Sequence, residues 1–129
     1  MRYNTILWDI DNTLLDFHAA QRRGIRESLA LFGRQADEAQ IAVYDRINQK
    51  YWEMLERGEV TKKELELARF REFLAAIGAE EIDVEKINDH YKNTLAYEPV
   101  LIEGAQDICA ALRKMGVRQY AVTNGDPFI

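Results

Sequence analysis

Apolar and polar positions divide the chain into two kinds of segment. Residues 5–8 form a continuous run of β-branched, apolar and aromatic side chains that ends at Asp9, and this run predicts a short strand buried on both faces. From about residue 16 to residue 95, apolar residues recur three and four positions apart, which is the spacing of amphipathic helices. Residues 117–123 predict a second strand, which an Asn-Gly turn signal follows.

The predicted helices share one apolar face and a turn or capping signal at their ends, and they span about residues 17–32, 37–57, 61–77, 83–95 and 105–115. Thr61 and Glu64 form the capping-box pattern in which a hydroxyl and a carboxylate bond to the first turn of a helix. The order of strand, four helices, helix and strand favours a parallel α/β unit with a helical insertion after its first strand.

Two strands make a small sheet for so many helices, because a doubly wound core contains several parallel strands that are buried on both faces. We therefore expect an α/β fold with an incomplete Rossmann-like core and interpret the chain as the N-terminal part of a larger enzyme. Its predicted domains are a partial core (1–15), an all-helical insertion (16–96) and a second part of the core (97–129).

The composition and charge of the chain argue against several classes of function. Of the 129 residues, 47% are apolar and 30% are charged, and the formal net charge is −5. Because no basic stripe is present, we expect no binding to a nucleic-acid polymer. The lone Cys109 excludes an internal disulfide and a four-thiolate zinc site, and its helical position indicates a packing role. No segment has the pattern of a signal peptide or a membrane span, so we expect a cytoplasmic protein without membrane contact.

Two carboxylates follow the first predicted strand. Residues two apart in an extended chain point to the same side, so Asp9 and Asp11 can face one small volume at the carboxyl end of the strand, where open α/β sheets bind ligands. Carboxylates this close repel, which raises one pKa and suits a hard cation such as Mg²⁺. A turn without catalytic role is the simpler alternative. An EF-hand calcium loop is excluded, because Leu14 and Ala20 occupy the positions that need glycine and a carboxylate.

Three features occur together in this sequence: a strand ending in Asp9-x-Asp11-x-Thr13, a helical insertion, and a later strand ending in Thr123-Asn124-Gly125. This combination resembles the haloacid dehalogenase (HAD) superfamily of phosphohydrolases, whose inserted helices form a cap. Within that superfamily, Gly58-Glu59-Val60-Thr61 and Arg69-Phe70 resemble the noncanonical pyrimidine 5′-nucleotidase group. The likeness covers the whole chain and corresponds to the N-terminal part of a family member.

The resemblance implies that Asp9 is a nucleophile that forms an aspartyl-phosphate, and that Asp11 is the general acid and base. Asp9 through its carboxylate and Asp11 through its backbone carbonyl would hold Mg²⁺. The resemblance also implies that Thr123 donates its hydroxyl to a phosphoryl oxygen, assisted by nearby backbone N–H groups. The residues assigned to substrate binding are Thr13, Thr123, Asn124 and Gly125.

The sequence departs from the family pattern at several points. Asn12 stands where the family usually has glycine, and asparagine tolerates left-handed geometry, so we expect the turn to be retained. The family's catalytic lysine and downstream acidic pair have no counterpart in residues 1–129, because Lys62, Lys63 and Lys114 lie in other segments. We therefore expect the chain to be inactive alone.

The resemblance places substrate specificity in the cap, with hinges near residues 14–17 and 96–104. Tyr44, Tyr51 and Trp52 could stack on a base, but their helical spacing favours a core position. Phe17 and His18 could contact a leaving group, although a solvent-facing histidine at a helix start is as good an interpretation.

The leading hypothesis is a Mg²⁺-dependent phosphomonoesterase that acts on a small phosphorylated substrate, a nucleoside 5′-monophosphate. A sugar-phosphate mutase or another HAD phosphatase is the enzymatic alternative, and a non-catalytic fragment or binding module is the third. Dehalogenase chemistry is disfavoured, since hydrolysis of a carbon–halogen bond does not need the acid at Asp11.

Overall fold

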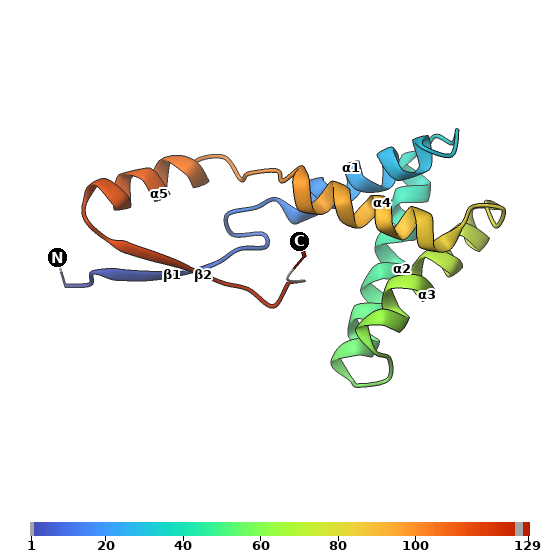
Figure 1. Cartoon of the computed structure of the whole chain (residues 1–129), viewed down its shortest axis with the longest axis horizontal. Helices are drawn as coiled ribbons and strands as arrows, with labels where there is room; N and C mark the ends of the chain where they lie inside the picture. Colours follow the sequence, from blue (N-terminus) through green and yellow to red (C-terminus); the bar gives the residue numbers. More distant parts are fainter. Residues whose placement is uncertain (1, 126–127) are drawn as a thin grey trace. The chain divides into compact units, whose positions relative to one another are not determined.

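The computed structural model describes residues 2–125 and 128–129 (Figure 1). Its elements in chain order are β1 (Thr5–Asp9), α1 (Phe17–Ala30), α2 (Glu38–Glu56), α3 (Lys62–Ala76), α4 (Val84–Tyr97), α5 (Ala105–Lys114) and β2 (Arg118–Val122). Each predicted strand and helix is confirmed, with ends that shift by a few residues. The chain divides into two compact units: a core unit made of Met1–Gln21 and Thr94–Ile129, and a helical unit made of Arg22–Asn93.

The predicted parallel pairing of the two strands is confirmed. β1 and β2 lie side by side in a two-stranded parallel sheet, in a register that places Thr5 opposite Arg118 and Asp9 opposite Val122. Because both strands run in the same direction and end at the same level, the loops that follow them leave the sheet at one edge. This edge is the place where the sequence predicts a ligand site.

The prediction that β1 is buried on both faces is wrong. Ile6 and Trp8 are half-buried, whereas the side chains that alternate with them are exposed, and Leu7 is 66% exposed. The half-buried face lies against α5: the indole N–H of Trp8 donates to the side-chain oxygen of Gln119 at 2.9 Å, and the Gln119 amide donates to the carbonyl oxygen of Cys109 at 2.9 Å. One helix covers one face of a sheet, so burial alternates along the strand.

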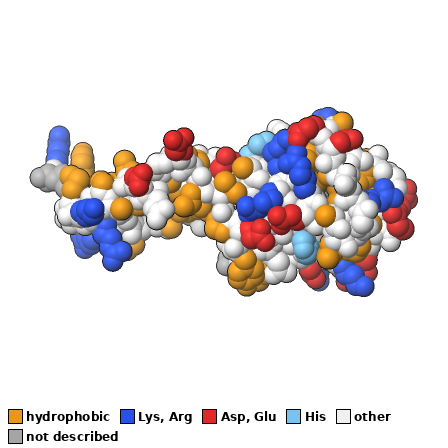
Figure 2. Space-filling view, turned by 90° about the horizontal axis from the view of Figure 1, so that it is seen from above, with side chains coloured by type: hydrophobic (Ala, Val, Ile, Leu, Met, Phe, Trp, Pro, Cys, Tyr) orange, Lys and Arg blue, Asp and Glu red, His pale blue; other side chains and the backbone are white. Residues whose placement is uncertain are grey.

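Exposed hydrophobic side chains gather on the core unit. Apart from Leu31, all the large exposed hydrophobic residues of the described chain belong to it: Tyr3, Leu7, Tyr97, Leu101, Ile108, Met115, Tyr120, Val122, Phe128 and Ile129. Figure 2 shows orange side chains at the surface of this unit. The apolar pattern that predicts a buried sheet is therefore present, but much of it faces solvent in this chain.

The two segments that connect β1 to α1 and α4 to α5 are joined to each other. Leu15 and Leu101 form an antiparallel bridge, the N–H of Asp16 donates to the carbonyl of Val100 at 2.7 Å, and the N–H of Ile102 donates to the carbonyl of Leu14 at 2.9 Å. All these residues belong to the core unit. The loop after β1 is thus held at its far end as well as by the strand.

The helical unit has a core of its own. Four aromatic side chains that are at most 1% exposed contact one another, with ring centroids between 5.2 and 5.7 Å apart: Tyr44, Phe70, Phe73 and Tyr91. Tyr44 is therefore a core residue, as its helical spacing indicates, whereas Tyr51 and Trp52 are half-buried. Edge-to-face pairs of this kind add to the stabilisation that apolar burial provides.

The start of α3 confirms the predicted capping box. The Glu64 N–H donates to the hydroxyl oxygen of Thr61 at 3.2 Å, and a carboxylate oxygen of Glu64 accepts from the Thr61 N–H at 2.7 Å. Asp37 and Gln40 form a second capping box at the start of α2. None of the helices in residues 2–125 has both the length and the apolar character needed to cross a lipid bilayer.

Candidate active site

A tight loop follows β1 directly. The carbonyl oxygen of Ile10 accepts hydrogen bonds from the N–H groups of Thr13, Leu14 and Leu15 at 3.2, 3.0 and 3.0 Å. Asn12 has a φ of 61°, in the left-handed region, so the expectation that asparagine supports this turn is confirmed. These three hydrogen bonds to one carbonyl define the path of the backbone that carries Asp11 and Thr13.

The two carboxylates at the end of β1 interact. The hydroxyl of Thr13 donates to Oδ2 of Asp9 at 2.9 Å, across one turn of the loop. The pKa of Asp11 is raised above its ordinary value of 3.8, first because the carboxyl group is partly buried and second because the Asp9 carboxylate repels its charge. The two acidic groups therefore share one electrostatic environment.

The loop after β2 reaches the same volume. The Gly125 N–H donates to the hydroxyl oxygen of Thr123 at 3.0 Å. A Cβ atom at Gly125 would lie 3.1 Å from that hydroxyl oxygen and 3.7 Å from Oδ2 of Asp11. The structure thus brings Thr123 and Asp11 to one small space, although they come from opposite ends of the sequence. Asn124 lies between Thr123 and Gly125 and is exposed.

The donor atoms at this edge suit a hard divalent cation. Carboxylate and carbonyl oxygens are the ligands that Mg²⁺ prefers. Burial is the main cause of the raised pKa of Asp11, and the second cause, repulsion by the Asp9 carboxylate, is the kind that a bound cation relieves. Among residues 2–125 and 128–129, no group of three or more His, Cys, Asp and Glu side chains is arranged to hold a metal ion. Asp9 and Asp11 are therefore two candidate metal ligands, and the described residues add no third acidic, histidine or cysteine side chain to them.

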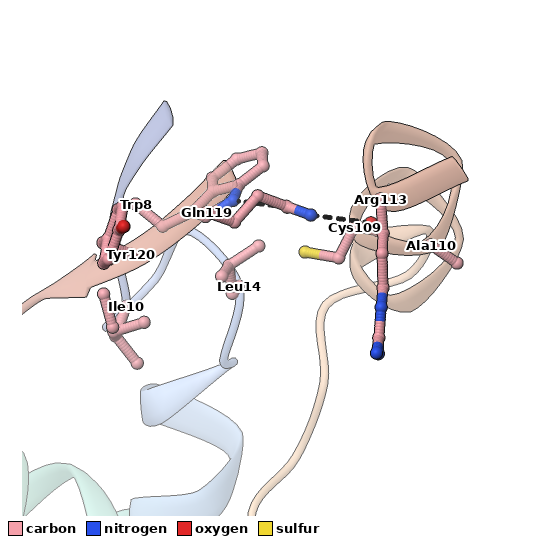
Figure 3. A pocket seen from close by; sticks show the side chains of 9 residues that line it. Trp8, Ile10, Leu14, Cys109, Ala110, Arg113, Gln119 and Tyr120 are labelled. Carbon is pink, nitrogen blue, oxygen red and sulfur yellow. Dashed lines mark hydrogen bonds between the residues drawn. The ribbon is translucent and has the colours of Figure 1, made fainter. Parts of the chain in front are cut away.

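A separate cavity of about 400 Å³ lies beside α5 and the sheet (Figure 3). Its lining is mostly apolar and consists of Trp8, Ile10, Leu14, Cys109, Ala110, Arg113, Gln119, Tyr120 and Ala121. None of the predicted site residues lines it. Cys109 lies among apolar neighbours there, as expected for a packing role.

Two features of the site were not anticipated from the sequence. The first is the bond between Thr13 and Asp9, whose only sequence signal is a hydroxyl four residues after a carboxylate in a loop. The second is the narrow space beside Gly125, which the sequence shows only as a turn signal. Lys62 and Lys63 lie at the start of α3, and Lys114 is the last residue of α5, in agreement with the segments expected for them.

Comparison with known proteins decides the family. The model of haloacid dehalogenase-like hydrolases matches residues 3–129. The chain belongs to this HAD-like hydrolase family. The resemblance inferred from the two motifs is confirmed, and so is the fold class, an α/β HAD core with inserted helices.

Two curated relatives are similar to this chain over nearly all of its length. The chain is 34% identical over 124 residues to YfnB of Bacillus subtilis, whose name describes it as a HAD-hydrolase, and 32% identical over 125 residues to the pyrimidine 5′-nucleotidase PynA of Streptococcus pneumoniae. These matches cover 96% and 97% of this chain and 52% of each relative, so the chain spans about half the length of the curated relatives it matches.

A crystal structure of YfnB, described as bound to magnesium and as revealing interdomain movement, is similar to this chain with a TM-score of 0.87. The sequence identity is 34%, and the match covers 98% of this chain and 54% of that chain. The chain therefore has the fold of about half of a solved HAD-hydrolase chain.

Proposed function

We propose that the protein is a Mg²⁺-dependent phosphomonoester hydrolase that works through an aspartyl-phosphate on Asp9, and that its substrate is a nucleoside 5′-monophosphate. The observation that carries this proposal is the meeting of Asp9, Asp11 and Thr123 at one edge of the parallel sheet. Membership of the HAD-like hydrolase family supports the reaction class. The likeness to PynA supports a nucleotide as substrate.

In the first step, a carboxylate oxygen of Asp9 forms a bond to phosphorus while the bond from phosphorus to the ester oxygen breaks. Asp11 in its protonated form gives its proton to that ester oxygen, so that the nucleoside leaves as a neutral alcohol. Asp9 and Asp11 are both exposed residues at the sheet edge, where a phosphate group can reach them.

In the second step, the Asp11 carboxylate takes a proton from a water molecule as the oxygen of that water bonds to phosphorus. The bond between phosphorus and Asp9 then breaks, inorganic phosphate leaves, and Asp11 is protonated again. Asp9 thus carries the phosphoryl group between the two steps, while Asp11 first donates a proton and then accepts one.

The carboxylate of Asp9 and the backbone carbonyl of Asp11 would hold Mg²⁺. When bound, the ion reduces the repulsion between an anionic nucleophile and an anionic ester. The all-oxygen donor set at this edge fits that role.

Thr123 and the backbone after it would bind the phosphate group. The hydroxyl oxygen of Thr123 accepts the bond from the Gly125 N–H, which leaves the hydroxyl hydrogen for a phosphoryl oxygen. A backbone N–H near Asn124, which is an exposed residue, would provide a further donor. Phosphoryl transfer depends mainly on such positioning and charge stabilisation.

The proposal extends to the domains. Residues 1–15 and 97–129 would form parts of the catalytic core, and residues 16–96 would be a cap that sets specificity. Because the chain spans about half the length of its relatives, the activity is proposed for the protein expressed from its complete reading frame, in the cytoplasm. Residues 1–129 alone are expected to release phosphate far more slowly.

The experiment is a phosphate-release assay on nucleoside 5′-monophosphates and sugar phosphates, with Mg²⁺ or with EDTA. Asp9→Asn tests the nucleophile, and Asp89→Asn, an exposed position on α4, is the matched control. We expect release from nucleotides that needs Mg²⁺, persists in Asp89→Asn and is lost in Asp9→Asn. Full activity in Asp9→Asn would refute the mechanism, and isomerisation of a sugar phosphate without phosphate release would identify a mutase.

A further inference from the structure

We infer that Tyr97 is a stacking surface for the base of the nucleotide substrate, with Phe128 packed against it. Tyr97 is the last residue of α4 and is 74% exposed, and Phe128 is 50% exposed. Their ring centroids lie 6.2 Å apart at an interplanar angle of 89°, which is an edge-to-face contact. Both residues belong to the core unit, which also contains the candidate active site. The inference rests on the proposed function and adds a specificity residue to it.

Short stretches of chain connect this aromatic pair to the candidate site. Phe128 is three positions after Gly125, so their Cα atoms are at most about 11 Å apart. Tyr97 is three positions before Val100, whose carbonyl accepts the N–H of Asp16, after the β1 loop, at 2.7 Å. A ribose separates the base of a nucleotide from its phosphate. A surface for the base is therefore needed beside the phosphate site and not within it, and the aromatic pair meets this requirement.

The aromatic residues of α2 are less accessible to a base. Tyr44 is 0% exposed in the core of the helical unit. Tyr51 and Trp52 are half-buried, and Lys50 Nζ lies 4.9 Å from the centroid of the Tyr51 ring. The edge-to-face contact, in comparison, covers at most one face of the Tyr97 ring, and most of the residue is exposed. Tyr97 is thus better placed for stacking than the aromatic residues that the sequence suggested.

Stacking on Tyr97 would distinguish nucleotides from other phosphate esters. Every nucleobase has a flat π-face, so an aromatic platform binds bases without choosing strongly between them. The contact with Phe128 limits the freedom of an exposed side chain, which lowers the entropy cost of ordering it against a substrate. We therefore expect Tyr97 to favour a nucleoside 5′-monophosphate over the same sugar phosphate without a base.

Substitutions at Tyr97 separate stacking from a structural role. Tyr97→Leu removes the ring and keeps an apolar side chain, whereas Tyr97→Phe keeps the ring. The matched control is Tyr3→Leu, because Tyr3 is 70% exposed in the same unit and precedes β1, whose other end carries Asp9. Each variant is prepared in the protein expressed from its complete reading frame, and thermal melting checks that it folds. Both kcat and KM are measured with a nucleoside 5′-monophosphate and with ribose 5-phosphate, which has no base.

We expect Tyr97→Leu to lower the ratio of kcat/KM for the nucleotide to kcat/KM for ribose 5-phosphate on the order of tenfold, the effect of one lost stacking contact. The change should come mainly from a raised KM for the nucleotide, because stacking binds substrate and transition state alike. Tyr97→Phe and Tyr3→Leu should retain the ratio of the unsubstituted protein. Phe128→Leu removes the edge-to-face contact and should give a smaller loss of the same kind.

Two provisions keep the comparison decisive. If ribose 5-phosphate is hydrolysed too slowly to measure, its Ki as a competitive inhibitor replaces its kcat/KM. If the leucine variant fails to fold, Tyr97→Gln removes the ring in the same way.

An unchanged ratio in Tyr97→Leu would overturn the inference, whether both substrates keep their kinetics or both are impaired equally. A phenylalanine variant with as low a ratio as the leucine variant would also overturn it, because the hydroxyl and not the ring would then be the contact. These results are distinct from failure of the proposed function. That failure appears as absence of phosphate release by the unsubstituted protein, or as full activity in Asp9→Asn.

Discussion

The backbone N–H of Gly125 donates a hydrogen bond to the hydroxyl oxygen of Thr123 at 3.0 Å. This contact orients a side chain at the end of β2 toward the space that Asp11 borders. Two short loops, each following one strand of a parallel pair, thereby build one candidate site. The parallel register is what makes this possible, because it ends both strands at the same edge.

The first prediction concerns the space beside Gly125. In Gly125→Ala the added Cβ would lie 3.1 Å from the Thr123 hydroxyl oxygen, so that oxygen must shift by a few tenths of an ångström. We expect kcat/KM for phosphate release to fall on the order of tenfold, because phosphoryl transfer depends on placement of such donors. Thermal stability should change little, since the residue is exposed.

A control variant should show the opposite behaviour. Gly58 follows α2 with a φ of +72° and has open space around it, so Gly58→Ala strains the backbone without touching the site. It should lower stability by about 1 kcal/mol and leave kcat/KM unchanged. If Gly125→Ala and Gly58→Ala behaved alike in both assays, the role given to the space beside Thr123 would be wrong.

The second prediction tests the capping box at the start of α3. Thr61→Ala removes the hydroxyl that accepts from the Glu64 N–H and should lower the free energy of unfolding by about 1 kcal/mol. Thr61→Ser should retain most of the stability. Chemical denaturation monitored by circular dichroism measures both, and equal stability of the alanine and unsubstituted proteins would contradict the assignment.

The third prediction concerns pH and the contact between α2 and α3. Both carboxylate oxygens of Glu72 accept from Lys50 Nζ at 2.6 Å, and the Tyr51 hydroxyl donates to one of them at 2.9 Å. The hydrogen bond from Lys50 is the largest cause that lowers the pKa of Glu72 below its ordinary value of 4.5. Because the folded pKa is the lower one, this stabilisation is present above pH 4.5 and is lost as the pH falls through the folded value.

Glu72→Gln should therefore lower stability at neutral pH by on the order of 0.5 kcal/mol, the size expected for a partly exposed ion pair. The difference between variant and unsubstituted protein should shrink as the pH falls below 4.5. Thermal melting across the acidic range measures it, with Glu85→Gln at the exposed start of α4 as the control. A difference that stays constant with pH would contradict the prediction.

The helices and strands could be predicted from the sequence because residues close together in the chain determine where each of them begins and ends. Gly33, Gly58 and Gly78 each have a positive φ and follow α1, α2 and α3, as a local signal for the end of a helix should. The exposure of Leu7 was not predictable in the same way, because it depends on which elements cover the sheet and not on the strand's own residues. The same distinction holds in the site. The spacing of Asp9 and Asp11 indicated a shared volume, whereas the bond from Thr13 depends on the backbone path of the loop.

The central claim is that phosphate is carried on the Asp9 carboxylate during the reaction, and chemical trapping tests it most directly. Borohydride reduces an acyl phosphate to an alcohol, so protein quenched during turnover of a nucleoside monophosphate should contain homoserine at residue 9. Peptide mass spectrometry identifies the residue, and protein treated without substrate is the control. Homoserine at residue 9 only with substrate is the result we predict. Trapping at another residue, or none during active turnover, would contradict the account.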